Sequence, residues 1–276
     1  MLDRAEYIEQ AHFFRTLSER MKQELPVQDL LTSLKQEILA STKLPMAIDF
    51  LASELRLVGA MASAMSRLPH YFTPFQTFVL AQAEEDRSRI DFAVAMQILE
   101  REALYRSESP TPQGVFLYQF ETLCRNRLQY YKGLTAMSAD PIFQPPWREF
   151  IVMVRAQIGM LDLADMIYLH RQHYQTVQSR RDHTDGRQPP VLFGEKEGQI
   201  ALANRRRDPL LLFAALQRHL NYPAIPRQPK ANEAAGALPL AIRRIEKLEA
   251  RVKLLEEEQK GGIDLTKFYK PPEETA

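Results

Sequence analysis

Residues 146 to 178 form a long stretch in which apolar side chains recur at helical spacing. After Pro146 the stretch contains one glycine, Gly159, and no further proline. Its apolar residues form two neighbouring stripes, one with Trp147, Phe150, Ile151, Val154, Ile158 and Leu161, and one with Met153, Met160, Leu163, Ala164 and Ile167. A helix with such a wide apolar surface is buried between other helices. We therefore expect one central helix, roughly 50 Å long at ~1.5 Å per residue.

The residues before this stretch predict five further helices. Prolines, N-capping residues and loops divide them into 3–24, 27–42, 45–66, 73–106 and 115–137. Thr73 followed by Pro74 is a typical N-cap and first helical position, and Asp3 with Glu6 resembles a capping box. The low glycine content, ten residues in 276, also favours helices. The sequence thus predicts an all-α fold, a bundle of about six long helices over residues 1–182.

Part of the central stretch matches an earlier segment at a constant offset of 100 residues. The matched residues are Pro45, Asp49, Phe50, Leu51, Val58, Gly59 and Met61, which correspond to Pro145, Glu149, Phe150, Ile151, Ile158, Gly159 and Leu161. The shared glycine is the least trivial match, because glycine inside a helix costs ~1 kcal/mol relative to alanine. Two interpretations stay open: a duplicated three-helix unit, over 3–66 and 73–180, or the chance similarity of amphipathic helices.

The chain changes character after residue 182. A polar linker leads to residues 191–203, whose two short apolar runs on either side of a Glu-Lys-Glu-Gly turn resemble a β-hairpin. Asp208 and Pro209 then begin a short, strongly apolar helix. We assign residues 183–222 to a linker with this hairpin and helix, and residues 223–237, with three prolines, to an extended spacer.

Residues 238–260 have the pattern of a coiled coil. The apolar seam consists of residues spaced alternately three and four apart: Leu238, Ala241, Ile245, Leu248, Val252 and Leu255. Arg244 and Arg251 fall at g positions, and Glu249 and Glu256 fall at e positions, where they can form ion pairs between parallel chains. Both Arg–Glu pairs also fit the Arg-h-x-x-h-Glu pattern of parallel trimers, where h is apolar. We expect self-association as a parallel trimer or dimer, or else a single helix folded back on the core.

A tail, residues 261–276, follows the coiled-coil pattern and begins with two glycines. It is expected to be flexible, and its apolar residues, which are candidates for binding a protein partner, are Ile263, Leu265, Phe268 and Tyr269.

The composition is that of a folded protein without a strong global charge. Formal net charge is +1, hydrophobic residues make up 45%, and Cys124 is the only cysteine. No run approaches the ~20 apolar residues of a membrane span, and the charged start of the chain does not resemble a signal peptide. We therefore expect a cytoplasmic protein with no membrane span.

Three kinds of site were considered for the function. Glu9 and His12 form one Glu-x-x-His pair, whereas di-iron bundles use two such pairs and further glutamates, so no metal or cofactor is expected. Arg205, Arg206 and Arg207 form a short basic run, but the chain has a formal net charge of only +1, which argues against a nucleic-acid partner. No phosphate-binding, dinucleotide-binding or nucleophile-elbow motif is present, and no catalytic residue is assigned.

The leading hypothesis is a non-enzymatic, oligomeric helical scaffold or adaptor that binds another protein. The alternatives are a metal- or ligand-binding bundle that uses Glu9 and His12, and a helical protein associated with nucleic acid.

Overall fold

The computed structural model describes residues 2–21, 27–85, 90–171 and 192–227. In these residues the regular structure is twelve α-helices, α1 (Arg4–Arg20), α2 (Val27–Glu37), α3 (Leu44–Val58), α4 (Met61–Ser66), α5 (Pro74–Glu84), α6 (Phe92–Ser107), α7 (Pro112–Arg125), α8 (Tyr130–Ser138), α9 (Pro145–Gln157), α10 (Leu163–Leu169), α12 (Glu195–Ala203) and α13 (Pro209–Leu220). The prediction of an all-α fold is confirmed for this part of the chain. None of these helices is long and apolar enough to cross a bilayer.

The helices are shorter and more numerous than the sequence predicted. The expected central helix ends at Gln157, because Gly159 adopts a φ of +86° and turns the chain before α10. The predicted helix over 45–66 is broken in the same way at Gly59, whose φ is +77°. Positive φ is accessible to glycine without the steric penalty that other residues pay. Both glycines therefore end helices, whereas the apolar period had indicated continuous ones.

Residues 191–203 do not contain the predicted hairpin, because Glu195–Ala203 is the helix α12. Glu195 and Glu197 lie in its first turn, where acidic side chains interact favourably with the helix dipole. Of the apolar residues that suggested strands, Leu192 and Phe193 are buried just before α12, and Ala201 is buried on α12 itself.

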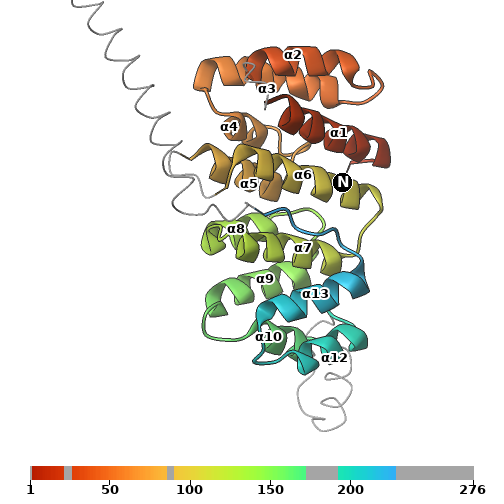
Figure 1. Cartoon of the computed structure of the whole chain (residues 1–276), viewed down its shortest axis with the longest axis vertical. Coiled ribbons are helices and arrows are strands. Elements are labelled where there is room, and N and C mark those ends of the chain that lie inside the picture. Colours follow the sequence, from red (N-terminus) through yellow and green to blue (C-terminus); the bar gives the residue numbers. More distant parts are fainter. Residues whose placement is uncertain (1, 22–26, 86–89, 172–191, 228–276) are drawn as a thin grey trace, which may run out of the picture. The chain divides into compact units, whose positions relative to one another are not determined.

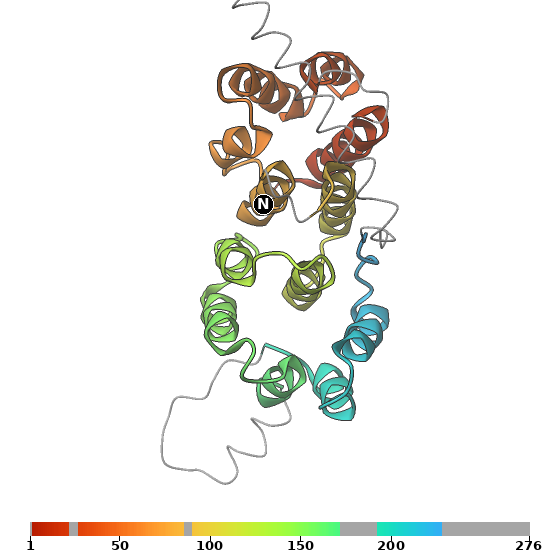
Figure 2. The same ribbon diagram turned by 60° about the vertical axis from the view of Figure 1, so that its left-hand side comes forward.

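The first six helices form a closed circuit, which we call the first helical set. α1 packs on α2, α2 on α3, α3 on α4, α4 on α5, α5 on α6, and α6 returns to α1. Figure 2 views these helices closer to end-on, in red to yellow. Phe13, Phe14, Leu17 and Phe72 are among the side chains that fill the interior, each at most 1% exposed.

The next six described helices repeat this arrangement as a second helical set. α7 packs on α8, α8 on α9, α10 on α12, α12 on α13, and α13 returns to α7. α9 meets α10 through Phe150 and the His170 ring, whose centroids are 4.9 Å apart. The set appears as the green-to-blue circuit in Figures 1 and 2. The two sets contact one another through α5 with α8 and through α6 with α7.

An aromatic cluster fills the interior of the second set. The Phe116 ring on α7 lies 5.6 Å from Trp147, 5.4 Å from Phe150 and 6.2 Å from Phe193, measured between centroids. Such tilted and edge-to-face pairs are favourable beyond the area that they bury. Trp147 is 6% exposed, which confirms its predicted burial, although it starts a helix of ordinary length.

A segment without helix, residues 222–227, follows α13 and joins the two sets; we call it the strap. It runs back along α6 and α7 (Figure 1). Arg101 on α6 donates to the Ala224 carbonyl, and Asn126 at the end of α7 donates to the Pro226 carbonyl at 3.2 Å. Tyr222, 2% exposed, donates to Glu121 on α7 at 2.7 Å. The Ala224 and Pro226 carbonyls are thereby hydrogen-bonded although they lie outside any helix.

Residues Met1–Gln228 form one compact unit, which includes α12 and α13. The sequence assigned residues 183–222 to a linker with a hairpin and a short helix; that helix is α13, which packs on α7, while α12 packs on α10. The remaining unit, Pro229–Ala276, lies outside the described residues.

Candidate functional site

The residues predicted to mediate oligomerisation and to bind a partner lie outside the described residues. These are the coiled-coil pattern over 238–260 and the apolar tail residues between 263 and 269. Their assignment therefore stays a prediction.

Glu9 and His12 do not belong to a metal site in the described part of the chain. His12 is exposed on α1, and the Glu9 carboxylate accepts a hydrogen bond from the Leu39 backbone N–H at 3.2 Å. No group of three or more His, Cys, Asp or Glu side chains able to hold a metal ion occurs among the described residues. The sequence offers Glu54, Glu84, Glu85 and Glu121 as further carboxylates for such a site. Glu84 instead accepts from two N–H groups at the start of α4, and Glu121 accepts from Tyr222.

A buried charge cluster, formed by Glu102, Arg106, Gln119 and Asp140, lies between the two helical sets. Each of these residues is at most 3% exposed. Arg106 on α6 is ion-paired with Glu102, one turn earlier, at 2.9 Å, and with Asp140, in the loop before α9. The Gln119 amide on α7 donates to Glu102 at 2.8 Å and to Asp140 at 3.1 Å. The cluster therefore ties α6 of the first set to α7 and Asp140 of the second.

The charges in the cluster do not balance, because two carboxylates surround one guanidinium. Burial raises the pKa of Glu102 above its ordinary value, and the positive charge of Arg106 opposes this shift only in part. Oε2 of Glu102 has no hydrogen-bond partner, so it is the oxygen available for a proton. A proton there would leave Arg106 and Asp140 as a balanced ion pair.

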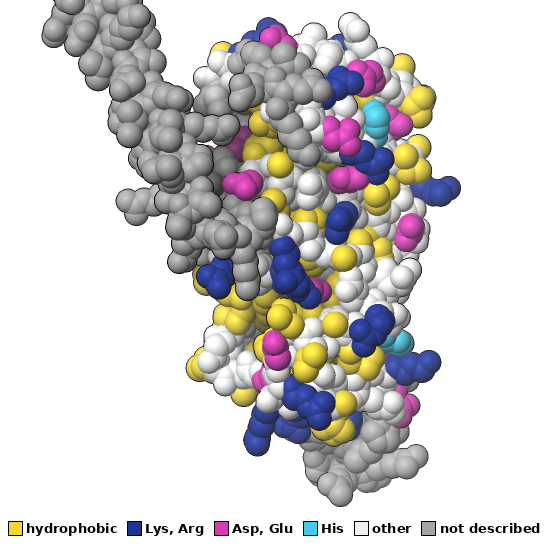
Figure 3. Space-filling model, viewed as in Figure 1, with side chains coloured by type: hydrophobic (Ala, Val, Ile, Leu, Met, Phe, Trp, Pro, Cys, Tyr) yellow, Lys and Arg dark blue, Asp and Glu magenta, His cyan; other side chains and the backbone are white. Residues whose placement is uncertain are grey.

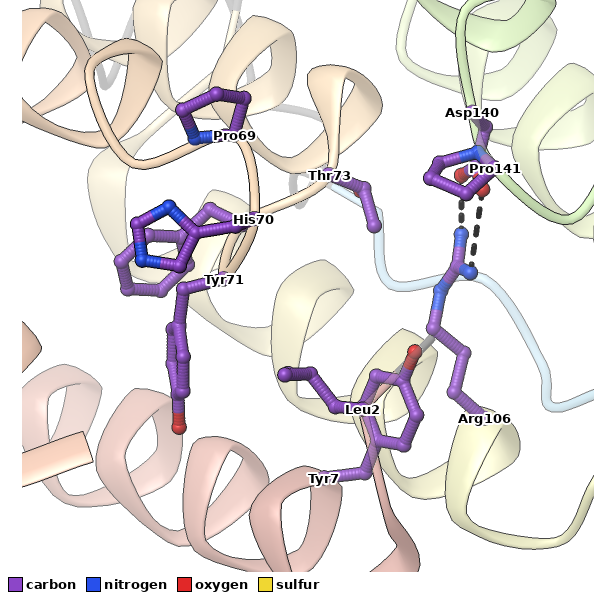
Figure 4. Close-up of a pocket in the computed structure, with 10 residues that line it drawn as sticks. Leu2, Tyr7, Pro69, His70, Tyr71, Thr73, Arg106, Asp140 and Pro141 are labelled. Carbon is purple, nitrogen blue, oxygen red and sulfur yellow. Dashed lines mark hydrogen bonds and ion pairs between the residues drawn. The ribbon is translucent and has the colours of Figure 1, made fainter. Parts of the chain in front are cut away.

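A cavity of about 290 Å³ opens beside this cluster (Figure 4). Its lining residues come from α1, the loop before α5, the end of α6 and the loop before α9: Leu2, Tyr7, Pro69, His70, Tyr71, Phe72, Thr73, Arg106, Asp140 and Pro141. The Tyr7 hydroxyl points toward Arg106 and Asp140, whereas the Tyr71 hydroxyl points away and donates to Glu6 at 2.8 Å. Arg106 is already neutralised by carboxylates, so the cavity does not offer an anion a free cation. The arrangement is that of a structural junction.

Exposed apolar side chains gather at one edge of the two sets, which we call the turn edge. The turns from α3 to α4, α7 to α8, α9 to α10 and α12 to α13 all lie there, at the left in Figure 1. The exposed side chains on or beside these turns are Leu57, Val58, Tyr130, Tyr131, Met160, Leu161, Leu210 and Leu211. Figure 3 shows yellow and dark blue side chains next to one another along the part of this edge between α8 and α13. The basic run of Arg205, Arg206 and Arg207 belongs to it.

Neither the buried charge cluster nor the turn edge was identified from the sequence. Glu102 and Arg106 have the i, i+4 spacing of a helical ion pair, but this spacing is also typical of exposed helix faces. The position of Asp140 beside them depends on how the two sets pack. The turns after α3, α7 and α9 lie where the sequence predicted helix interiors, and only the turn before α13 was expected.

No protein-family model matches the chain, and no curated protein or solved structure matches it.

Proposed function

We propose that this protein is a non-enzymatic helical scaffold that self-associates through residues 238–260 and binds another protein. The observation that carries the proposal is the apolar seam, with arginine at g and glutamate at e in two consecutive heptads. β-branched Ile245 and Val252 at a, with leucine at d, favour two strands. The two Arg-h-x-x-h-Glu patterns favour a parallel trimer, and the trimer is the state we propose.

The anchored strap supports this proposal. It attaches the chain to both helical sets as far as residue 227, and the coiled-coil pattern begins at residue 238 of the sequence. Exposed ion pairs are worth under about 1 kcal/mol each, so the apolar seam supplies the stability and the charged pairs select the number and direction of chains. The apolar tail residues, Ile263, Leu265, Phe268 and Tyr269, are the proposed contact for the protein partner.

Cysteine cross-linking in the full-length chain tests the parallel arrangement. Leu255 lies at a d position, where identical residues of parallel chains meet, so Leu255→Cys should form interchain disulfides under mild oxidation. Glu257 lies at the outer f position of the same heptad, and Glu257→Cys is the matched control. The native Cys124 should not interfere, because burial raises the pKa of its thiol to about 11 and the thiolate is the reactive form. Equal cross-linking of both variants would contradict the proposal.

A further inference from the structure

The cavity beside the buried charge cluster has an exposed mouth and a buried polar end. Three of its lining residues, Pro69, His70 and Pro141, are exposed and mark the mouth. At the polar end, the Tyr7 hydroxyl points toward Arg106 (Figure 4), and both residues are at most 4% exposed. The volume of about 290 Å³ is close to the lower limit of pockets that bind small molecules. A small molecule can therefore enter from the solvent and reach buried polar groups.

The Tyr7 hydroxyl differs from those of the other buried tyrosines in the described part of the chain. Each of the others donates to a carbonyl or carboxylate oxygen; these are Tyr71, Tyr105, Tyr118 and Tyr222. The Tyr7 hydroxyl has no such partner among the described residues, although Tyr7 is only 4% exposed. A buried hydroxyl without an acceptor costs free energy. We therefore expect its proton to be donated to a molecule in the cavity.

Arg106 also keeps one N–H group without an acceptor. A guanidinium has five N–H groups. Nε and Nη2 donate to Glu102, and Nη1 and Nη2 donate to Asp140, so one N–H of Nη1 has no acceptor among the described residues. Both Asp140 oxygens are fully used, because they also accept from the Ile142 N–H and the Gln119 amide. The spare hydrogen-bonding capacity of the buried polar end is therefore that of a donor.

The charges beside the cavity favour a neutral ligand. An anion would meet the carboxylates of Glu102 and Asp140 as well as the guanidinium of Arg106. A cation would meet the guanidinium and would find no free oxygen on Asp140. With a proton on Glu102 the cluster is balanced, and an added charge in a buried site is costly unless it is paired.

We propose that this cavity binds a small neutral molecule with a carbonyl oxygen, such as an amide or a ketone. The carbonyl oxygen accepts from the Tyr7 hydroxyl and from Nη1 of Arg106, and the apolar part of the molecule contacts Leu2 and Phe72. Water satisfies only the polar end, whereas such a ligand also removes apolar surface from water. This inference goes beyond the scaffold function and does not require the chain to self-associate.

Three probes of nearly the same shape and different charge test the proposal: neutral benzamide, anionic benzoate and cationic benzamidine. Saturation-transfer NMR titrations at neutral pH measure the binding of each probe to the full-length protein. Tyr7→Phe removes the hydroxyl and keeps the ring. Tyr131→Phe is the matched control, because Tyr131 is 69% exposed on α8 and does not line the cavity. Leu2→Trp adds volume at a lining residue that precedes α1.

The wild-type protein is expected to bind benzamide with a Kd on the order of 1 mM, as is usual for so small a ligand, and to bind both charged probes at least about tenfold more weakly. Tyr7→Phe should weaken benzamide binding about fivefold through the lost hydrogen bond, and Leu2→Trp should abolish it. Tyr131→Phe should bind as the wild type does.

Thermal unfolding of each variant checks that it folds. Tyr7→Phe should keep the wild-type midpoint, because the lost hydroxyl bonds to no described residue, and this variant decides the test if Leu2→Trp does not fold. No binding of benzamide to the wild type, stronger binding of either charged probe, or unchanged binding in Tyr7→Phe overturns the proposal.

Discussion

At the scale of single residues, the proton on Glu102 has a defined consequence for stability. Its pKa is raised in the folded protein, so the folded state binds this proton more tightly than the unfolded state does. The resulting contribution to stability is fully present below the ordinary pKa of 4.5 and is lost as the pH rises through the folded value. Glutamine has nearly the same shape and cannot ionise.

We therefore expect Glu102→Gln to gain stability relative to the wild type as the pH rises from about 4 to 8. Urea unfolding of both proteins across this range measures the difference. Asp140→Asn provides the contrast, because it removes the partner of a buried guanidinium and should cost up to about 3–5 kcal/mol at neutral pH. If the wild type instead became more stable relative to Glu102→Gln as the pH rises, this account of the cluster would be wrong.

At the scale of the helical element, Gly159 sets the break between α9 and α10. A Cβ at this position would meet no atom within 4 Å, so the glycine is required by its φ of +86° and not by packing. Gly159→Ala should destabilise the protein by about 1–2 kcal/mol, the cost of a left-handed conformation for an L-residue. Gly159→Asn should cost less, because asparagine tolerates this conformation.

Chemical denaturation of the two Gly159 variants measures both effects. An unchanged stability in Gly159→Ala would mean that the break is imposed by the packing of α10. Gly198 is required for the opposite reason, namely lack of space, since a Cβ there would lie 2.5 Å from Cδ of Arg171.

The helix starts were more predictable than the helix ends. Thr73 caps α5 as predicted, in a capping box with Gln76 that the sequence reading had not named, and Asp3 and Asp208 accept hydrogen bonds at the starts of α1 and α13. Those contacts involve neighbours in the sequence. Gly59 and Gly159 were predicted to lie inside helices because the apolar pattern continues across each turn. Glycine suits both a close contact between helices and a positive φ, so the residue type alone did not distinguish the two.

At the scale of the whole molecule, the offset of 100 residues has a structural counterpart. It pairs α3 with α9, the third helix of each set, and it pairs the two glycines with positive φ. Phe72 and Phe193 are likewise buried just before the fifth helix of each set. We infer a duplication of six helices rather than three, with additional residues between α10 and α12. The closure of each set depends on long-range packing, which the local pattern does not contain.

Sedimentation equilibrium measures most directly whether residues 229–276 assemble three chains into a trimer. The full-length chain and a chain ending at Gln228 are compared over a range of concentrations. We predict that the full-length protein has three times the 31.9 kDa mass of one chain and that the shorter chain is a folded monomer. Monomers in both samples, or the same oligomer in both, would contradict the account.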